Sequence, residues 1–196
     1  MPKVDCHLSK RPLLGEDSQC GDVGIISEFD GHCFVALVDV LGHGQGAYEV
    51  ALIAKQFLEQ HCHEAVEDVM QGLHLCLKGT RGAVAALCRL HIATGSMRYV
   101  GVGNISTKVL GSHAFRLVPR DGIVGYMMMS PKEQTAKLYA GDVLVMHSDG
   151  IKENFDTFEY AGLLRGTAKS IASGLLNKFG KKEDDASCLV LRYYND

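Results

Sequence analysis

The sequence contains no tryptophan, only four prolines, no CxxC pair and no long uninterrupted apolar run. A membrane-spanning helix would need about 18 consecutive apolar residues, and residues 1–12 lack the apolar centre of a signal peptide. The seven cysteines are an odd number and are scattered, which argues against a disulfide framework or a thiolate zinc site. We therefore expect a cytoplasmic protein whose thiols are reduced and mostly buried.

The sequence also lacks a long block of basic residues. The formal net charge is -3, and the only notable basic block is the pair Lys181–Lys182. Nucleic-acid binding normally requires a basic surface, and stacking on bases commonly uses aromatic side chains. We therefore expect neither a nucleic acid nor a membrane as a partner.

Short apolar runs bounded by Gly or Asp predict strands, and apolar residues at helical spacing predict three helices. The strands are VGIIS, CFVALV, AVAALCRLHI, MRYVGVG, TKVL, AFRLV, DVLVMHS and SCLVLRYY; the helices cover about 47–58, 66–77 and 168–179. A length of 196 residues suits one domain, residues 1–196. The pattern favours an α+β fold of packed, largely antiparallel sheets flanked by helices.

Aspartates occur where several predicted strands begin or end. Asp39 follows CFVALV, Asp149 follows VLVMHS, and the pair Asp184–Asp185 precedes SCLVL. If the first two strands run one way and the third runs the other, these carboxylates converge at one sheet edge. Clustered carboxylates repel unless a cation neutralises them, and oxygen ligands favour Mg²⁺ or Mn²⁺ over Zn²⁺. The alternative is that each is a turn residue beside glycine.

The stretch VDVLGHGQGA carries a strand end, a glycine-rich loop and the start of a helix. Glycine lets a backbone approach a ligand, and a helix N-terminus favours anions such as phosphate. A nucleotide-binding loop is therefore an alternative, but the lysine of a Walker loop is missing. His43 lies four residues after Asp39 and could protonate a leaving oxygen as a general acid. A solvent-exposed loop histidine is the competing interpretation.

The motifs CGD, VDVLGHG, RGAVAAL, VGVGN, HSDG and EDDAS occur in this order over residues 20–192. In this order they resemble the metal-dependent serine/threonine protein phosphatases of the PPM type, in particular the short SpoIIE-like bacterial branch and its stressosome phosphatases. The resemblance implies two packed antiparallel sheets with helices outside and two Mn²⁺ or Mg²⁺ ions. It also implies hydrolysis of phosphoserine or phosphothreonine on scaffold proteins of a stressosome-like complex.

The resemblance further assigns roles to individual residues. Carried over onto matching motif positions, the metal ligands are Asp22, Asp39, the backbone carbonyl of Val40, Asp149 and Asp184. Asp39 resembles the ligand that bridges both ions. Asp22 could bind a metal ion directly or through a metal-bound water molecule. Asp184 is preferred to its neighbour Asp185. Asn104 falls in the VGVGN turn near the site, or is simply a turn residue.

Two positions depart from the family pattern. Gly21 stands where larger relatives carry a glutamate, and Val40 stands where a glycine is usual. Larger relatives also carry an upstream arginine that binds the substrate phosphate, and we assign no residue of this sequence to that role. These departures motivate an alternative function, a metal-poor pseudophosphatase that binds phosphoproteins without turnover.

Overall fold

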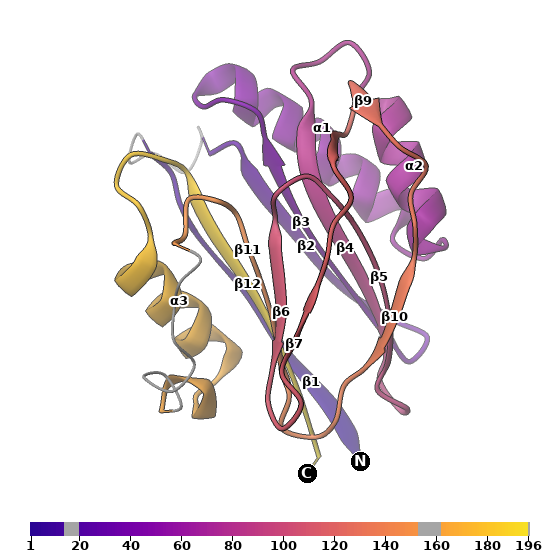
Figure 1. Ribbon diagram of the computed structural model, residues 1–196, viewed down its shortest axis with the longest axis vertical. Coiled ribbons are helices and arrows are strands. Elements are labelled where there is room, and N and C mark those ends of the chain that lie inside the picture. The colour runs from indigo at the N-terminus through magenta and orange to yellow at the C-terminus, as the bar shows by residue number, and fades with distance from the viewer. Residues whose placement is uncertain (14–19, 153–161, 196) are drawn as a thin grey trace.

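The computed structural model describes residues 1–13, 20–152 and 162–195. Two five-stranded antiparallel sheets pack face to face, with helices on both outer faces (Figure 1). One sheet has the order β1 (Pro2–Arg11), β12 (Ala186–Asn195), β11 (Val143–His147), β6 (Ser106–Leu110) and β7 (Phe115–Leu117). The other has the order β10 (Gln134–Lys137), β5 (Ser96–Val102), β4 (Ala83–His91), β3 (His32–Val40) and β2 (Asp22–Phe29). The expected α+β class with antiparallel sheets and flanking helices is confirmed.

Helices α1 (Gln45–His61) and α2 (Val66–Cys76) cover the β2–β5 sheet, and α3 (Ala168–Phe179) covers the β1–β12 sheet. Each helix buries a stripe of apolar residues at helical spacing, such as Ala47, Ala51 and Leu58 in α1. Thr167 caps α3 by accepting the N–H of Ser170. Among the described residues, no helix is both long and apolar enough to cross a bilayer.

Three apolar layers hold these elements together. One lies between α1, α2 and their sheet, a second between the two sheets, and a third between α3 and its sheet. Strands β3 and β4 are apolar on both faces because both faces are covered, so their burial is nearly continuous. The seven cysteines are all free thiols, and five of them are buried.

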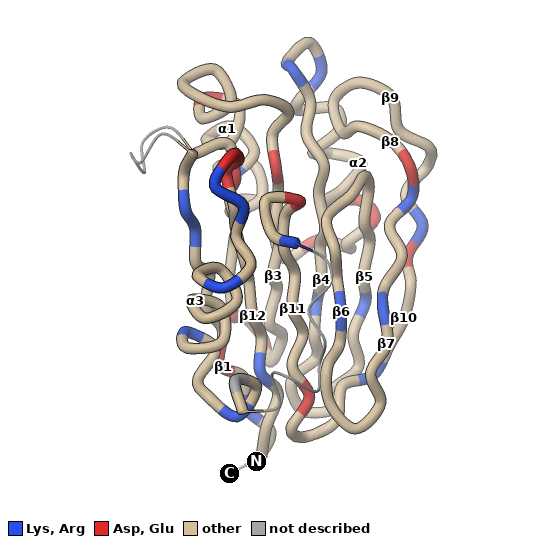
Figure 2. Tube along the Cα trace, turned by 60° about the vertical axis from the view of Figure 1, so that its left-hand side comes forward, with Lys and Arg blue, Asp and Glu red and all other residues tan. Residues whose placement is uncertain are grey.

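Four strands were not expected from the sequence: β1, β10 and the short hairpin β8 (Gly122–Ile123) and β9 (Met127–Met128). The predicted convergence of aspartates at one edge of a single sheet is wrong in its detail. Strand β3 belongs to one sheet, whereas β11 and β12 belong to the other. Several acidic positions instead gather at the end of the two-sheet sandwich that lies opposite the chain termini (Figure 2).

Candidate metal centre

Asp39 and Asp22 lie on adjacent antiparallel strands and are directly opposite each other in the β2–β3 register. Asp39 faces the pocket, but Asp22 is only 1% exposed and does not line it. The Oδ2 atom of Asp22 accepts a hydrogen bond of 2.7 Å from the Ser148 hydroxyl, which anchors it to the segment after β11. Asp22 is therefore placed behind Asp39, where it acts on the pocket through charge.

Asp149 follows β11 and enters the pocket from the other sheet. Its Oδ2 atom accepts a hydrogen bond of 3.0 Å from the side-chain amide of Asn104. Gly103, rather than Asn104, takes the left-handed backbone conformation at this turn, with φ of 93°. Asn104 therefore orients a carboxylate and is not needed as a left-handed turn residue.

The neighbouring aspartates 184 and 185 have different surroundings. Asp184 lines the pocket, whereas Asp185 is 6% exposed and points into the protein. The carboxylate of Asp185 accepts the backbone N–H groups of Leu13 and Gly21, at 2.7 and 2.8 Å. Asp184 therefore faces the pocket, whereas Asp185 holds the segment just before β2 through hydrogen bonds.

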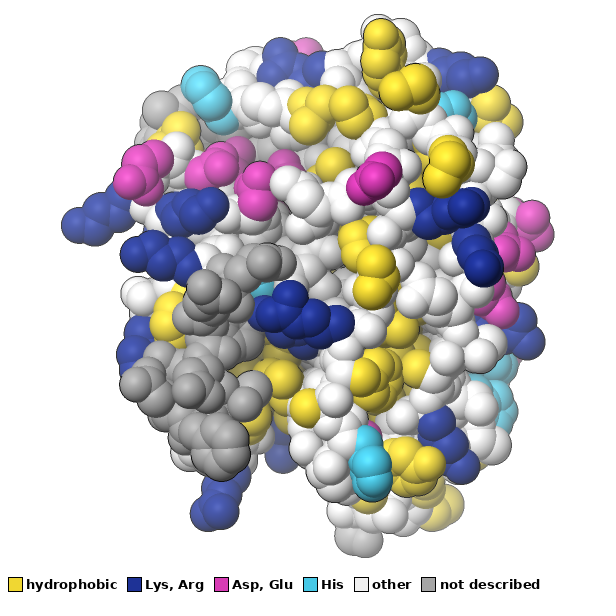
Figure 3. Space-filling model, viewed as in Figure 1, with side chains coloured by type: hydrophobic (Ala, Val, Ile, Leu, Met, Phe, Trp, Pro, Cys, Tyr) yellow, Lys and Arg dark blue, Asp and Glu magenta, His cyan; other side chains and the backbone are white. Residues whose placement is uncertain are grey.

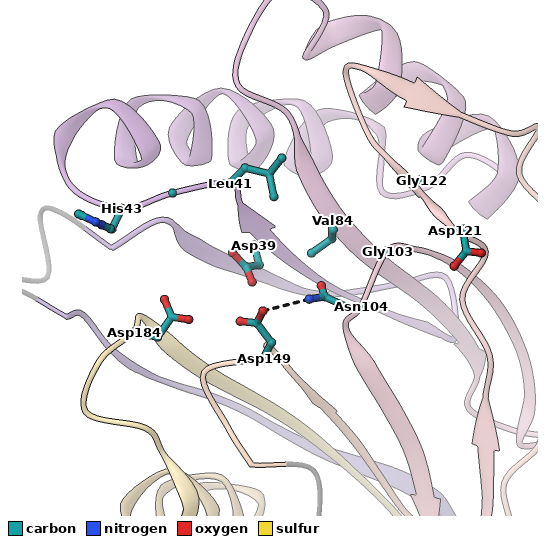
Figure 4. Close-up of a pocket in the computed structure, with 11 residues that line it drawn as sticks. Asp39, Leu41, His43, Val84, Gly103, Asn104, Asp121, Gly122, Asp149 and Asp184 are labelled. Atoms are coloured by element: carbon teal, nitrogen blue, oxygen red, sulfur yellow. Dashed lines mark hydrogen bonds between the residues drawn. The ribbon is translucent and has the colours of Figure 1, made fainter.

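The pocket has a volume of about 430 Å³ and lies between the two sheets at their common end. Asp39, Asp149 and Asp184 point toward one another there, with Asn104 on one side (Figure 4). They come from β3, the end of β11 and the segment before β12. Acidic groups that are far apart in the sequence are thus brought together by packing one sheet on the other.

Burial and mutual repulsion change the acidity of these groups. Burial, and then the charges of Asp22, Asp149 and Asp184, raise the pKa of Asp39 to about 9. Burial raises the pKa of Asp22 to about 6, although hydrogen bonds from Ser187 and Ser148 oppose the rise. Burial and the charge of Asp149 also raise the pKa of Asp184. Without a cation, the site therefore retains protons at neutral pH.

These carboxylates have the chemistry of a divalent-cation site. They offer hard oxygen donors, burial and then neighbouring negative charge raise their pKa values, and Oδ1 of Asp22 is buried without a hydrogen-bond partner. Within the described ranges, however, no three acidic, His or Cys side chains are grouped tightly enough to bind one ion. One or two carboxylates completed by water would fit such an arrangement, as is common for Mg²⁺.

The remaining predicted residues lie at or near the same site. Val40 has the extended backbone of β3, so its β-branched side chain is accommodated without strain. His43 is exposed at the pocket rim. A side chain at Gly21 would begin 3.1 Å from Cβ of Ala47 and 3.3 Å from Oδ2 of Asp185. A side chain at position 21 would therefore crowd Ala47 and Asp185.

Two contributors were missed from the sequence. Asp121, just before β8, lines the far side of the pocket and lies apart from the other three carboxylates (Figure 4). Its sequence RDG resembles SDG at Asp149, and this similarity could have flagged it. Ser148 holds Asp22 through its hydroxyl and also accepts the Ser187 backbone N–H at 3.0 Å. No pattern in the sequence indicates that role.

A profile of the family described as stage II sporulation protein E (SpoIIE) matches residues 30–194, which is most of the chain. The chain belongs to the SpoIIE family. One solved structure comes from a study of the bacterial stressosome as a modular system adapted to control secondary messenger signaling. It is 32% identical, with a TM-score of 0.89, and the alignment covers 97% of this chain and 100% of that one.

Two more distant structures support the fold of this SpoIIE-family chain. RsbX in complex with magnesium is 22% identical, with a TM-score of 0.84 over 98% of this chain and 100% of that one. The catalytic domain of the serine/threonine protein phosphatase PstP with two manganese ions is 13% identical, with a TM-score of 0.73 over the whole of both chains. No protein of curated function matches significantly by sequence. The chain therefore has the fold of metal-dependent serine/threonine phosphatases.

Proposed function

We propose that this protein is a metal-dependent phosphatase that hydrolyses phosphoserine or phosphothreonine on scaffold proteins of a stressosome-like complex in the cytoplasm. The observation that carries the proposal is the convergence of Asp39, Asp149 and Asp184 in one open pocket between the sheets. The family match and the structural similarity to phosphatases support the reaction class. The stressosome context is supported by the 32% identical relative.

Asp39, Asp149, Asp184 and the Val40 carbonyl would hold Mn²⁺ or Mg²⁺, two ions by analogy with the PstP structure. When bound, the ions would neutralise phosphoryl charge and acidify a water molecule. Asn104 contributes by fixing the orientation of Asp149 through the 3.0 Å hydrogen bond. Asp22 contributes buried negative charge behind Asp39, held by the Ser148 hydroxyl.

His43 could supply the proton that a serine or threonine oxygen needs as it leaves. It is exposed at the pocket rim, four residues after Asp39, and a histidine can exchange protons near neutral pH. Protonation of a poor leaving group typically contributes about 10²–10⁴-fold. The open pocket leaves room for a phosphorylated side chain to enter from a protein surface.

Hydrolysis of p-nitrophenyl phosphate and of a phosphorylated scaffold domain tests the proposal. Both should require added Mn²⁺ or Mg²⁺ and stop on chelation, and Asp39→Asn should remove activity without unfolding the protein. A protein that binds the phosphorylated scaffold but turns over neither substrate at any metal concentration would be a pseudophosphatase. Turnover of p-nitrophenyl phosphate without turnover of the scaffold would retain the chemistry and refute the partner.

A further inference from the structure

The guanidinium of Arg81 lies on the glycine-rich loop beside the carboxylate pocket. Arg81 belongs to the segment between α2 and β4, and its Nη1 atom donates a 3.2 Å hydrogen bond to the Leu41 carbonyl. Leu41 and the next residue, Gly42, both line the pocket. Arg81 does not itself line the pocket, but it is exposed to solvent next to two residues that do, so it remains accessible to a ligand.

Two glycines leave the space in which this guanidinium lies. A Cβ atom at Gly42 would be 2.8 Å from Nη1 of Arg81, and one at Gly46 would be 2.7 Å from Nη2. Gly42 has a φ of 84°, so its backbone alone favours glycine. Gly46 is the second residue of α1 and has no positive φ, so its backbone conformation does not require glycine. Arg81 supplies all three atoms nearest to the absent Cβ, so a side chain at position 46 would displace the guanidinium from this position.

Besides metal ions, a phosphorylated substrate needs side-chain donors for its phosphoryl oxygens. Among the described residues, the pocket lining includes four aspartates and no lysine or arginine. A phosphoryl group carries about 1.5 to 2 negative charges at neutral pH, and no side chain of this lining offers it a positive charge. Arginine suits the task because its planar guanidinium donates two parallel hydrogen bonds to phosphate oxygens.

Other cations near this end of the molecule are placed differently. Lys152, Lys181 and Lys182 line a second cavity, which shares Asp184 with the carboxylate pocket. Figure 3 shows a row of acidic side chains with Lys and Arg on both sides of it. Arg81 differs from the three lysines because it is hydrogen-bonded to a residue that lines the pocket and occupies space left by two glycines.

We infer that Arg81 binds the phosphoryl oxygens of the substrate at the pocket rim, positioned by the space that Gly42 and Gly46 leave. This inference rests on the proposed phosphatase function and names the residue that grips its substrate. It also reassigns the glycine-rich loop. The loop supports the Arg81 side chain, which binds the anion. The sequence alone had suggested that the backbone of the loop would approach the anion.

The test compares four variants with the wild type: Arg81→Ala, Arg81→Lys, Gly46→Ala and the double variant Arg81→Ala/Gly46→Ala. With saturating Mn²⁺, we would measure kcat and KM on p-nitrophenyl phosphate and on a phosphoserine peptide, and the inhibition constant of inorganic phosphate. Arg98→Ala is the charge-matched control, because Arg98 pairs with Glu133 on the surface and does not line the pocket. Thermal unfolding of each variant separates binding from stability.

Arg81→Ala should raise KM and the inhibition constant of phosphate by about 10- to 100-fold, the loss expected for a hydrogen bond to a charged group. Both substrates should be affected equally, the melting temperature should stay near that of wild type, and Arg81→Lys should recover part of the loss. Gly46→Ala should weaken phosphate binding in the same direction while leaving the melting temperature unchanged or higher. In the double variant, Gly46→Ala should add nothing, because its effect acts through Arg81.

An unchanged phosphate inhibition constant in Arg81→Ala would overturn the inference, as would a loss that merely follows a lower melting temperature. A loss on the peptide alone would place Arg81 against the peptide chain and refute the phosphoryl contact. Additive effects in the double variant would refute the role of Gly46. If the wild type hydrolyses neither substrate, the proposed function fails separately, and calorimetric titration of inorganic phosphate into the Mn²⁺-loaded protein still decides the role of Arg81.

Discussion

Substituting Asp184 and Asp185 one at a time should separate metal binding from folding at adjacent positions. In Asp185→Asn, the amide can still accept one N–H group, but its NH₂ must face the other of the two donors, Leu13 and Gly21. The variant loses a charge-assisted hydrogen bond and leaves a buried donor unpaired, which together cost about 2–4 kcal/mol. For a chain of this length, that loss lowers the melting temperature by about 5–15 °C.

Asp184→Asn should behave in the opposite way. Asp184 lines the pocket, and its pKa is raised by burial and by the charge of Asp149. Removing its charge relieves repulsion, so the metal-free protein should be as stable as the wild type or more stable. Affinity for Mn²⁺ should fall by more than about tenfold because an anionic oxygen facing the pocket is lost.

The assay is thermal unfolding in chelator, followed by calorimetric titration of Mn²⁺ into each variant at a temperature where it is folded. The expected pattern is a lower melting temperature for Asp185→Asn with metal affinity close to that of wild type, and the reverse for Asp184→Asn. If Asp184→Asn were the destabilised variant, or if Asp185→Asn kept its stability and lost metal binding, the assignment of the two aspartates would be refuted.

Four further outcomes are expected. The pKa of Asp39 is raised to about 9, so in chelator its contribution to stability is complete below about pH 4 and is lost as the pH rises toward 9. The melting temperature of Asp39→Asn should lack this decrease with rising pH. Burial, and then Lys78, lower the pKa of His74, whose Nδ1 accepts the Gly125 N–H; the protection factor of that amide against hydrogen exchange should decrease as falling pH protonates the ring. His43→Ala should slow hydrolysis of a phosphoserine peptide by about 10²-fold or more and barely affect p-nitrophenyl phosphate, whose phenolate leaves unaided; equal losses would exclude a general acid. Thiol titration of the native protein should modify exposed Cys76 first, and Cys76→Ser should remove that fast phase.

Most of the fold could be predicted because its strands are buried and its helices are strongly amphipathic. Strand β3 is apolar over CFVALV, and such a run bounded by Gly and Asp is recognisable. Strand β1 was missed because it is an edge strand in which only Val4, Cys6 and Leu8 contribute to the core between the sheets. Strands β8 and β9 have two residues each, too few for any periodicity to be visible.

The site was predictable in its residue types and less so in its arrangement. Aspartates at strand ends indicated a carboxylate cluster, but a single sequence does not show which strands share a sheet. Nor does it show that Asp22 is buried behind Asp39 or that Asp185 turns inward. The glycine-rich loop was the hardest part to interpret. Gly46 lies against the side chain of Arg81, 35 positions later in the sequence, and only tertiary structure brings the two together.

The negative charges that allow this pocket to bind a cation also destabilise the folded protein when no cation is bound. Asp39 enters from one sheet, whereas Asp149 and Asp184 enter from the other, so their repulsion acts across the interface between the sheets. A cation that neutralises them stabilises the folded state by a free energy that grows with the logarithm of its concentration relative to its dissociation constant. When no cation is bound, the apolar core between the two sheets must hold the sheets together against this repulsion. Asn104 and Ser148 limit the cost by holding Asp149 and Asp22 in fixed orientations before any ion arrives.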